Sequence, residues 1–223
     1  MTFFSTLQTE TESERKQLIS SALVQDALAG KLDRDTYAAF LGQAYHHVKH
    51  TVPLLMAAGS RIPADMEWLR SALAEYVEEE LGHQEWILND IKASGYDADA
   101  VRRGVPNAAT ELMVAYAYHV IDRGNPVGFF GMVHVLEGTS VSVADQAADS
   151  IARSTGLGPE AFTYLRSHGT LDIEHVKFFE NLMNRIEKEE DQQAIVHCAK
   201  RFYGLYAGVY DSVRADQAIG RAA

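Results

Sequence analysis

Hydrophobic residues recur along most of this chain at the three-to-four-residue spacing of an amphipathic helix, and no segment alternates convincingly as a half-buried strand does. Glycine, proline and helix-capping residues interrupt the pattern at intervals. The pattern therefore predicts about seven helices joined by short connections. Their expected ranges are about 10–29, 34–58, 64–94, 107–122, 126–155, 159–187 and 190–214.

Individual residues mark the expected ends of these helices. Gly30 stops the first, Asp33 is placed to cap the second, and Pro53 is expected to kink the second near its end. We predict a loop at 96–107, and frayed ends at residues 1–9 and 215–223. Because long helices with short connections pack as bundles, the sequence predicts an all-α single domain over residues 1–223.

Composition and charge narrow the class of protein. The net charge of −11 argues against sequence-independent binding to nucleic acid and against binding to anionic lipid. The first residues lack a basic stretch followed by an apolar run, and no apolar run approaches the roughly 20 residues of a membrane span. Cys198 is the single cysteine, which excludes an intrachain disulfide and a cysteine metal cluster. We therefore expect a cytoplasmic protein.

Three polar residues share the apolar face of the sixth predicted helix. At about 100° per residue, Asp172, His175, Phe179 and Leu182 all fall within about 40° of His168 around the helix axis. A buried ionised carboxylate is costly unless it changes its pKa, pairs with another charge or binds a cation. Core packing alone does not explain these three polar residues, so we expect them to have a chemical role.

The third and fifth predicted helices show the same intrusion of polar groups. Glu80 falls on the arc of Leu73, and His83 lies about 60° away on the same side. Glu79 borders this face. Glu137 faces inward on the fifth helix, where small neighbouring residues leave room beside its carboxylate.

Six inward-facing residues therefore stand out: the carboxylates Glu80, Glu137 and Asp172 and the imidazoles His83, His168 and His175. A set of carboxylates and imidazoles without a thiolate suits iron, manganese or zinc. Glu80 and His83 form a Glu-x-x-His pair, whose members are neighbours on a helix, and this motif recurs in carboxylate-bridged di-iron bundles. A structural hydrogen-bond network is the alternative for the sixth helix. The convergence of three helix faces favours a metal site.

The quoted stretches "EELGHQEW", "VLEGTS" and "HGTLDIEH" resemble the haem-oxygenase-like di-iron oxidases and oxygenases, in the superfamily of thiaminase-II-like and pyrroloquinoline-quinone-synthase-like proteins. The resemblance extends over nearly the whole chain, including "YAAFLGQAYHHVKHTVPLL". It implies a haem-oxygenase-like bundle of helices that holds two non-haem irons and uses O₂ to oxidise a small amino-acid-like or fatty-acid-like substrate.

The resemblance also implies roles for single residues. The metal ligands fall on six positions: Glu80, His83, Glu137, His168, Asp172 and His175. Several family members place another carboxylate on the second helix, where this chain has His46, His47 and His50. One of these histidines, of which His47 is the named candidate, or Glu79 is therefore expected to complete the site unless that corner is open. Tyr76 and Tyr164 share the ligand faces and are the candidate catalytic residues.

Other features leave alternatives open. On the last predicted helix, which also holds Tyr203, Tyr206 and Tyr210, Arg201 is a candidate clamp for a substrate carboxylate. Cys198 is a candidate thiaminase-type nucleophile, which Ala44 disfavours because related thiaminases carry an acidic residue there. The rival functions are a cofactor-free oxidase, an iron-binding protein without an organic substrate, and a haem-degrading enzyme with His46, His47 or His50 as axial ligand. A small-molecule substrate is expected, with an external electron donor and a second copy of the chain as further candidate partners.

Overall fold

The computed structural model describes the backbone of residues 1–220, with side chains except at 140–142, 168–175 and 215–220. Every element in residues 1–220 is helical, which confirms the all-α prediction. The helices are α1 (Phe3–Glu10), α2 (Glu12–Ile19), α3 (Ala22–Leu28), α4 (Arg34–Val48), α5 (Thr51–Arg61), α6 (Glu67–Glu80), α7 (His83–Ala93), α8 (Ala98–Arg103), α9 (Ala108–Arg123), α10 (Phe130–Thr155), α11 (Thr163–Met183) and α12 (Glu189–Gly220). Three short 3₁₀ helices join them: η1 (Ala64–Met66), η2 (Pro126–Phe129) and η3 (Pro159–Ala161).

Several long predicted helices are broken into shorter ones. The second divides at Lys49–His50, ahead of Pro53, which instead lies in the first turn of α5, where its missing N–H removes no helical bond. The third divides at Leu81–Gly82, where Gly82 has a left-handed φ of 91°. The prediction of unbroken helices at these two places was wrong.

The predicted ends also needed correction. Residues 3–10 form α1, whose Phe3, Phe4 and Leu7 are buried, so the N-terminal segment is held by packing and is not frayed. At the other end α12 continues to Gly220. The predicted loop at 96–107 contains α8, while the predicted cap is confirmed because Asp33 Oδ1 accepts a hydrogen bond of 2.8 Å from the Thr36 backbone N–H.

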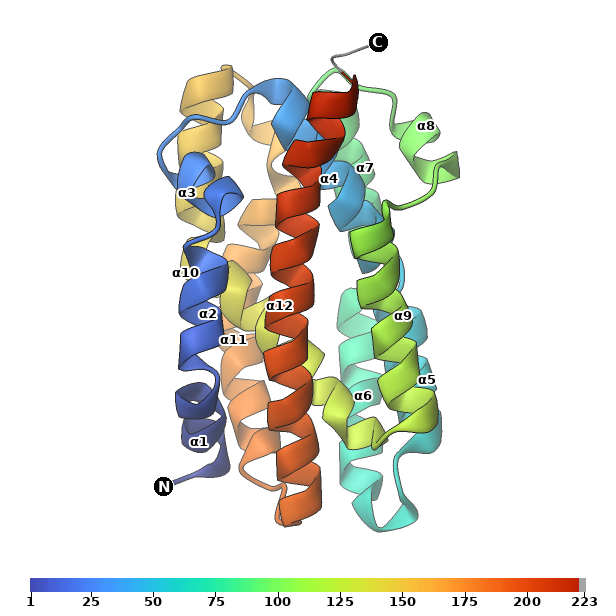
Figure 1. The fold of residues 1–223 in the computed structure, drawn as a ribbon. Coiled ribbons are helices and arrows are strands. Elements are labelled where there is room, and N and C mark those ends of the chain that lie inside the picture. The colour runs from blue at the N-terminus through green and yellow to red at the C-terminus, as the bar shows by residue number, and fades with distance from the viewer. Residues whose placement is uncertain (221–223) are drawn as a thin grey trace.

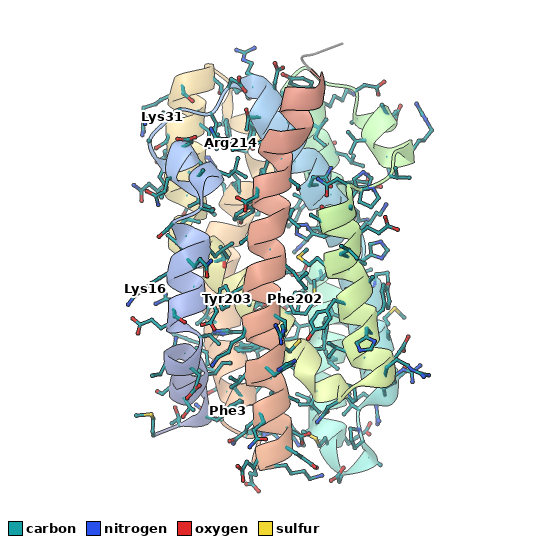
Figure 2. The ribbon with its side chains drawn as sticks, viewed as in Figure 1. Phe3, Lys16, Lys31, Phe202, Tyr203 and Arg214 are labelled. Atoms are coloured by element: carbon teal, nitrogen blue, oxygen red, sulfur yellow. The ribbon has the colours of Figure 1, made fainter. Side chains whose placement is uncertain are left out.

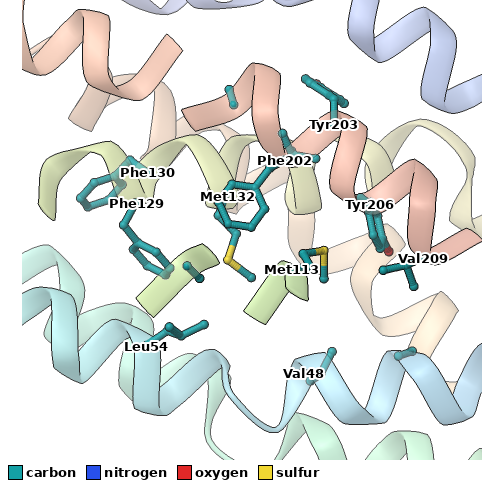
Figure 3. Close-up of a cluster of buried hydrophobic side chains, with 14 of the residues drawn as sticks. Val48, Leu54, Met113, Phe129, Phe130, Met132, Phe202, Tyr203, Tyr206 and Val209 are labelled. Atoms are coloured by element: carbon teal, nitrogen blue, oxygen red, sulfur yellow. The ribbon is translucent and has the colours of Figure 1, made fainter. Parts of the chain in front are cut away.

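The helices run mostly along one direction (Figure 1). The longest, α12, contacts α10, α9, α4 and α2, and α10 crosses behind it while also packing along α11. On α12, Tyr203 points toward α2 and Phe202 toward α9, where Phe202 meets Tyr116 at a ring-centroid distance of 5.3 Å (Figure 2). A cluster of buried side chains from η2, α10 and α12 faces Leu54 and Val48 (Figure 3).

Among the residues that the structure describes, no single helix is long and apolar enough to cross a membrane. The bent pair Pro126–Thr139 and Val143–Thr155 meets that criterion only when its two parts are taken together, as the buried core helices of soluble proteins also do.

His134 is a buried imidazole that ties α10 to the joint between α1 and α2. Its Nε2 lies 3.3 Å from Thr11 Oγ1, and because that hydroxyl donates to the Leu7 carbonyl at 2.8 Å, the imidazole N–H is the donor to Thr11. The ring also stacks on Phe179, with a centroid distance of 5.9 Å. Burial lowers the pKa of His134 to about 4, with a smaller contribution from the charge of Arg15.

We expect acid to destabilise the fold through His134. The imidazole has a pKa of about 4 in the folded state and its usual value of 6.5 in the unfolded state. Its contribution to stability is therefore fully present above pH 6.5 and is lost as the pH falls from 6.5 toward 4. Between pH 7 and pH 5 this residue alone should cost about 2 kcal/mol of unfolding free energy. Urea unfolding of wild type and His134→Gln at both values measures the difference. His46, whose pKa is also lowered to about 4, remains in both proteins, so the variant keeps a shallower slope; an equal loss in the two proteins would contradict the assignment.

Candidate metal and substrate site

A cavity of about 150 Å³ lies between α3, α4, α5, α6, α10, α11 and α12. Most of its lining is apolar. The polar part of the lining includes two carboxylates, one imidazole and four phenols: Glu80, Glu137, His47, Tyr76, Tyr164, Tyr206 and Tyr210. Among the described residues that line it there is no lysine or arginine. The cavity therefore joins acidic groups to an otherwise apolar chamber.

Glu80 and His83 lie together although the helix that was expected to carry both is broken between them. Glu80 ends α6 and His83 begins α7, and His83 Nδ1 lies 3.1 Å from Glu80 Oε2. Their side chains are 14% and 6% exposed. The His83 ring stacks on Trp86, with centroids 4.0 Å apart, and does not line the cavity. Glu80 thus stands between this imidazole and the cavity.

Tyr76 lies near both carboxylates of the cavity, Glu80 and Glu137. It is 1% exposed, and burial raises the pKa of its phenol far above the usual value, with the charge of Glu137 as the next cause and those of Glu79 and Glu80 after it. The phenol therefore stays protonated at any physiological pH. Tyr76 can supply an O–H donor to this acidic wall of the cavity.

The cavity distinguishes the three histidines on the second predicted helix. His47 is buried and lines the cavity, and its Nδ1 lies 3.2 Å from the Gln43 carbonyl oxygen, which assigns the proton to Nδ1 in the neutral ring. Its Nε2 then keeps a lone pair, as a metal-ligating imidazole requires. His46 and His50 line no part of it: they lie against Lys49 and Tyr118 respectively.

The sixth-helix candidates His168, Asp172 and His175 belong to α11, but their side chains lie outside the described residues. Within the described part of the chain no three His, Cys, Asp or Glu residues gather closely enough to hold a metal ion. The donor types that face the cavity, carboxylate oxygen and imidazole nitrogen, nevertheless fit iron. Of the neighbouring candidates, Tyr164 lines the cavity, whereas Glu79 is exposed and does not.

Asp90 fixes the start of α11, and sequence reasoning missed it. This fully buried residue of α7 accepts hydrogen bonds from the backbone N–H groups of Thr163 at 3.0 Å and Tyr164 at 2.8 Å. It caps a helix from a distant part of the chain. Burial raises the pKa of this carboxyl to about 6, although the two N–H donors lower it. The available signal was its place beside Ile91 on the buried side of the third predicted helix.

A family model described as an iron-containing redox enzyme matches residues 38–207, which is most of the chain. The chain belongs to the iron-containing redox enzyme family. This protein is accordingly an oxidoreductase, and its membership confirms the resemblance at the level of the superfamily. No protein with a curated description matches the chain significantly.

Solved structures similar to this iron-containing redox enzyme confirm the haem-oxygenase-like fold. A domain of unknown function with that fold from Shewanella denitrificans is 23% identical, with a TM-score of 0.88 over 98% of this chain and 94% of that one. Haem oxygenase from Leptospira interrogans is 18% identical, with a TM-score of 0.76 over 95% of this chain and all of the other (100%). A TenA homologue from Pseudomonas syringae is 10% identical, with a TM-score of 0.79 over 96% and 93% of the two chains. At these identities the likeness is one of fold alone.

Two candidates of the last helix lie away from the cavity of this iron-containing redox enzyme. Arg201 is exposed and does not line the cavity, so it is not placed there to clamp a substrate carboxylate. Cys198 is 1% exposed and also lies outside the cavity, and burial raises the pKa of its thiol to about 12. A thiol held protonated in this way is a poor nucleophile.

Proposed function

We propose that this chain is a non-haem di-iron oxidase or oxygenase that uses O₂ to oxidise a mainly apolar organic molecule. The observation that carries the proposal is the acidic wall of the buried cavity. Glu80 and Glu137 face one apolar chamber with His47, and Glu80 is in contact with His83 behind it. Carboxylates that face an apolar chamber are costly unless they change their pKa, pair with another charge or bind a cation, and bound iron would meet this requirement for both.

Iron would be held by Glu80, His83 and Glu137, by His168, Asp172 and His175 of α11, and by His47 at the remaining corner. Glu80, which contacts His83 and also lines the cavity, would be one of the carboxylates that hold iron. Bound iron would supply the electrons that O₂ requires. The protein would contribute the ligands, an apolar chamber that excludes water, and the phenols of Tyr76 and Tyr164 as donors to groups formed in the cavity.

The composition of the cavity lining supports an apolar substrate over an amino acid. The described lining offers no cation to pair with a carboxylate, and Arg201 lies elsewhere. An amino-acid-like substrate would find no lysine or arginine among the described lining residues to pair with its carboxylate, and an unpaired buried charge is costly. A fatty-acid-like molecule could place only its tail there.

Anaerobic titration with ferrous iron tests the proposal. We expect about two irons per chain, as in other carboxylate-bridged di-iron bundles, followed by O₂ uptake and transient visible absorption on exposure to air. Haem added to the iron-free protein in a parallel sample should leave the Soret band of free haem unshifted. Iron binding below one equivalent, or a shift and sharpening of the Soret band that saturates at one haem per chain, would show that the proposal is wrong. Iron uptake and O₂ consumption without any oxidised organic product, in a screen of apolar compounds, would instead indicate an iron-storage or ferroxidase role.

A further inference from the structure

The cavity has two unlike parts. Glu80 and Glu137 mark the polar part, and the remainder extends between α3 and the second half of α10, which lie beside each other (Figure 1). We call this remainder the apolar arm, and its principal lining residues are Val24, Ala27, Leu32, Ala144, Ala147 and Ile151. At 1.5 Å per residue, Ile151 lies about 20 Å along α10 from Glu137. The lining of the cavity therefore follows α10 for several turns beyond Glu137.

Two contacts between neighbouring segments lie at the far end of the arm. There the turn after α3 packs onto the end of α10: a Cβ on Gly30 would lie 3.3 Å from the Ser150 carbonyl oxygen. Ser154 Oγ lies 3.1 Å from the Leu32 carbonyl oxygen, within hydrogen-bond distance. These contacts join the two segments on either side of Ile151. We infer that the arm ends here and that a molecule entering from the carboxylates can go no further.

Small side chains keep the arm open between its two ends. Ala27 of α3 and Ala147 of α10 both line the cavity, and each contributes one methyl group where a larger residue would project into the space. We propose that the arm selects the substrate by the length of an unbranched apolar tail, and that Ala27 and Ala147 set how far this tail enters. This inference rests on the proposed function only in treating the tail as part of the oxidised molecule.

Binding of neutral n-alkanols to the iron-free protein tests the inference, because a primary alcohol needs neither iron nor a charged partner. Affinity is measured by displacement of Nile red along a series from hexanol to dodecanol. In wild type we expect a gain of about fourfold per methylene, which stops abruptly at a limiting length. In Ala147→Leu the limiting length should be shorter: the longest alcohol that wild type accommodates should bind about tenfold more weakly, and hexanol should bind as before.

The control is Gln146→Leu, which places the same side chain at the preceding position of α10, where the residue is exposed and outside the cavity. If Ala147→Leu fails to fold by circular dichroism, Ala27→Val tests the facing wall in the same way. An unchanged limiting length in a folded variant, an equal effect of Gln146→Leu, or no dependence on chain length in wild type would overturn the inference. None of these outcomes bears on iron uptake, which is titrated separately.

Discussion

Glu137→Gln should lower iron binding from about two ions per chain to about one. The substitution keeps the volume of the side chain but removes the negative charge that would compensate the second ion. Even changes in groups that only orient ligands weaken metal binding by 10–100-fold, so we expect loss of a direct ligand to cost at least about a hundredfold in affinity for that ion. Oxygen consumption with substrate should fall with it, to the level of the protein without iron.

Glu78→Gln is the matched control, because Glu78 lies on α6 close to Glu80 in sequence but is exposed and outside the cavity. It should load iron as wild type does. His175→Ala gives a second variant on the opposite helix, α11, and should resemble Glu137→Gln. If both variants take up iron with wild-type stoichiometry and affinity, the assignment of the ligands is wrong.

Gly131→Ala should be the most destabilising single methyl group in the core. A Cβ at this position of α10 would lie 2.5 Å from the Ala199 backbone nitrogen, 2.6 Å from the Ile195 carbonyl oxygen and 2.8 Å from Cys198 Cβ. Two of these atoms belong to the backbone of α12 and cannot rotate away, so the helices must separate. Overpacking typically costs 1–3 kcal/mol, and with two backbone contacts we expect about 3 kcal/mol or more.

Urea unfolding measured by circular dichroism gives the free energy directly. The control is Gly204→Ala on α12, where an added Cβ meets nothing within 4 Å. That variant should be stabilised by about 0.5–1 kcal/mol, because alanine favours the helix over glycine. A Gly131→Ala protein that unfolds at the wild-type urea concentration would show that α10 and α12 are not packed this closely.

The sequence predicted which helix faces are buried. That prediction holds even where one predicted helix is in fact two. Leu69, Leu73, Ile87 and Ile91 are at most 2% exposed, on both sides of the break at Leu81–Gly82. Hydrophobic periodicity reports burial, which continues across a short break if the next helix keeps the same face toward the core. Periodicity carries no comparable signal for the break, and a single glycine in a helical pattern is common.

The polar contacts were harder to predict because they join distant segments. Asp90 reaches the start of α11 more than 70 residues later, and His134 pairs with Thr11 across 123 positions. Neither partner is marked by local spacing. The choice of His47 over its neighbours depended in the same way on which face of α4 meets the cavity, which follows from packing and not from the motif. Arg201 was a candidate because a guanidinium can bind a carboxylate. The neighbouring residues in the sequence do not show that its side chain is exposed.

Helix α7 makes two polar contacts, about two turns apart, with segments that carry proposed iron ligands. Its first residue, His83, contacts Glu80 of α6, and Asp90 holds the beginning of the helix that bears His168, Asp172 and His175. The end of α6 and the start of α11 are therefore both tied to one short helix. If these segments hold iron as proposed, a movement of α7 would carry both along together, so thermal motion of the bundle should alter the position of the site more readily than its internal dimensions.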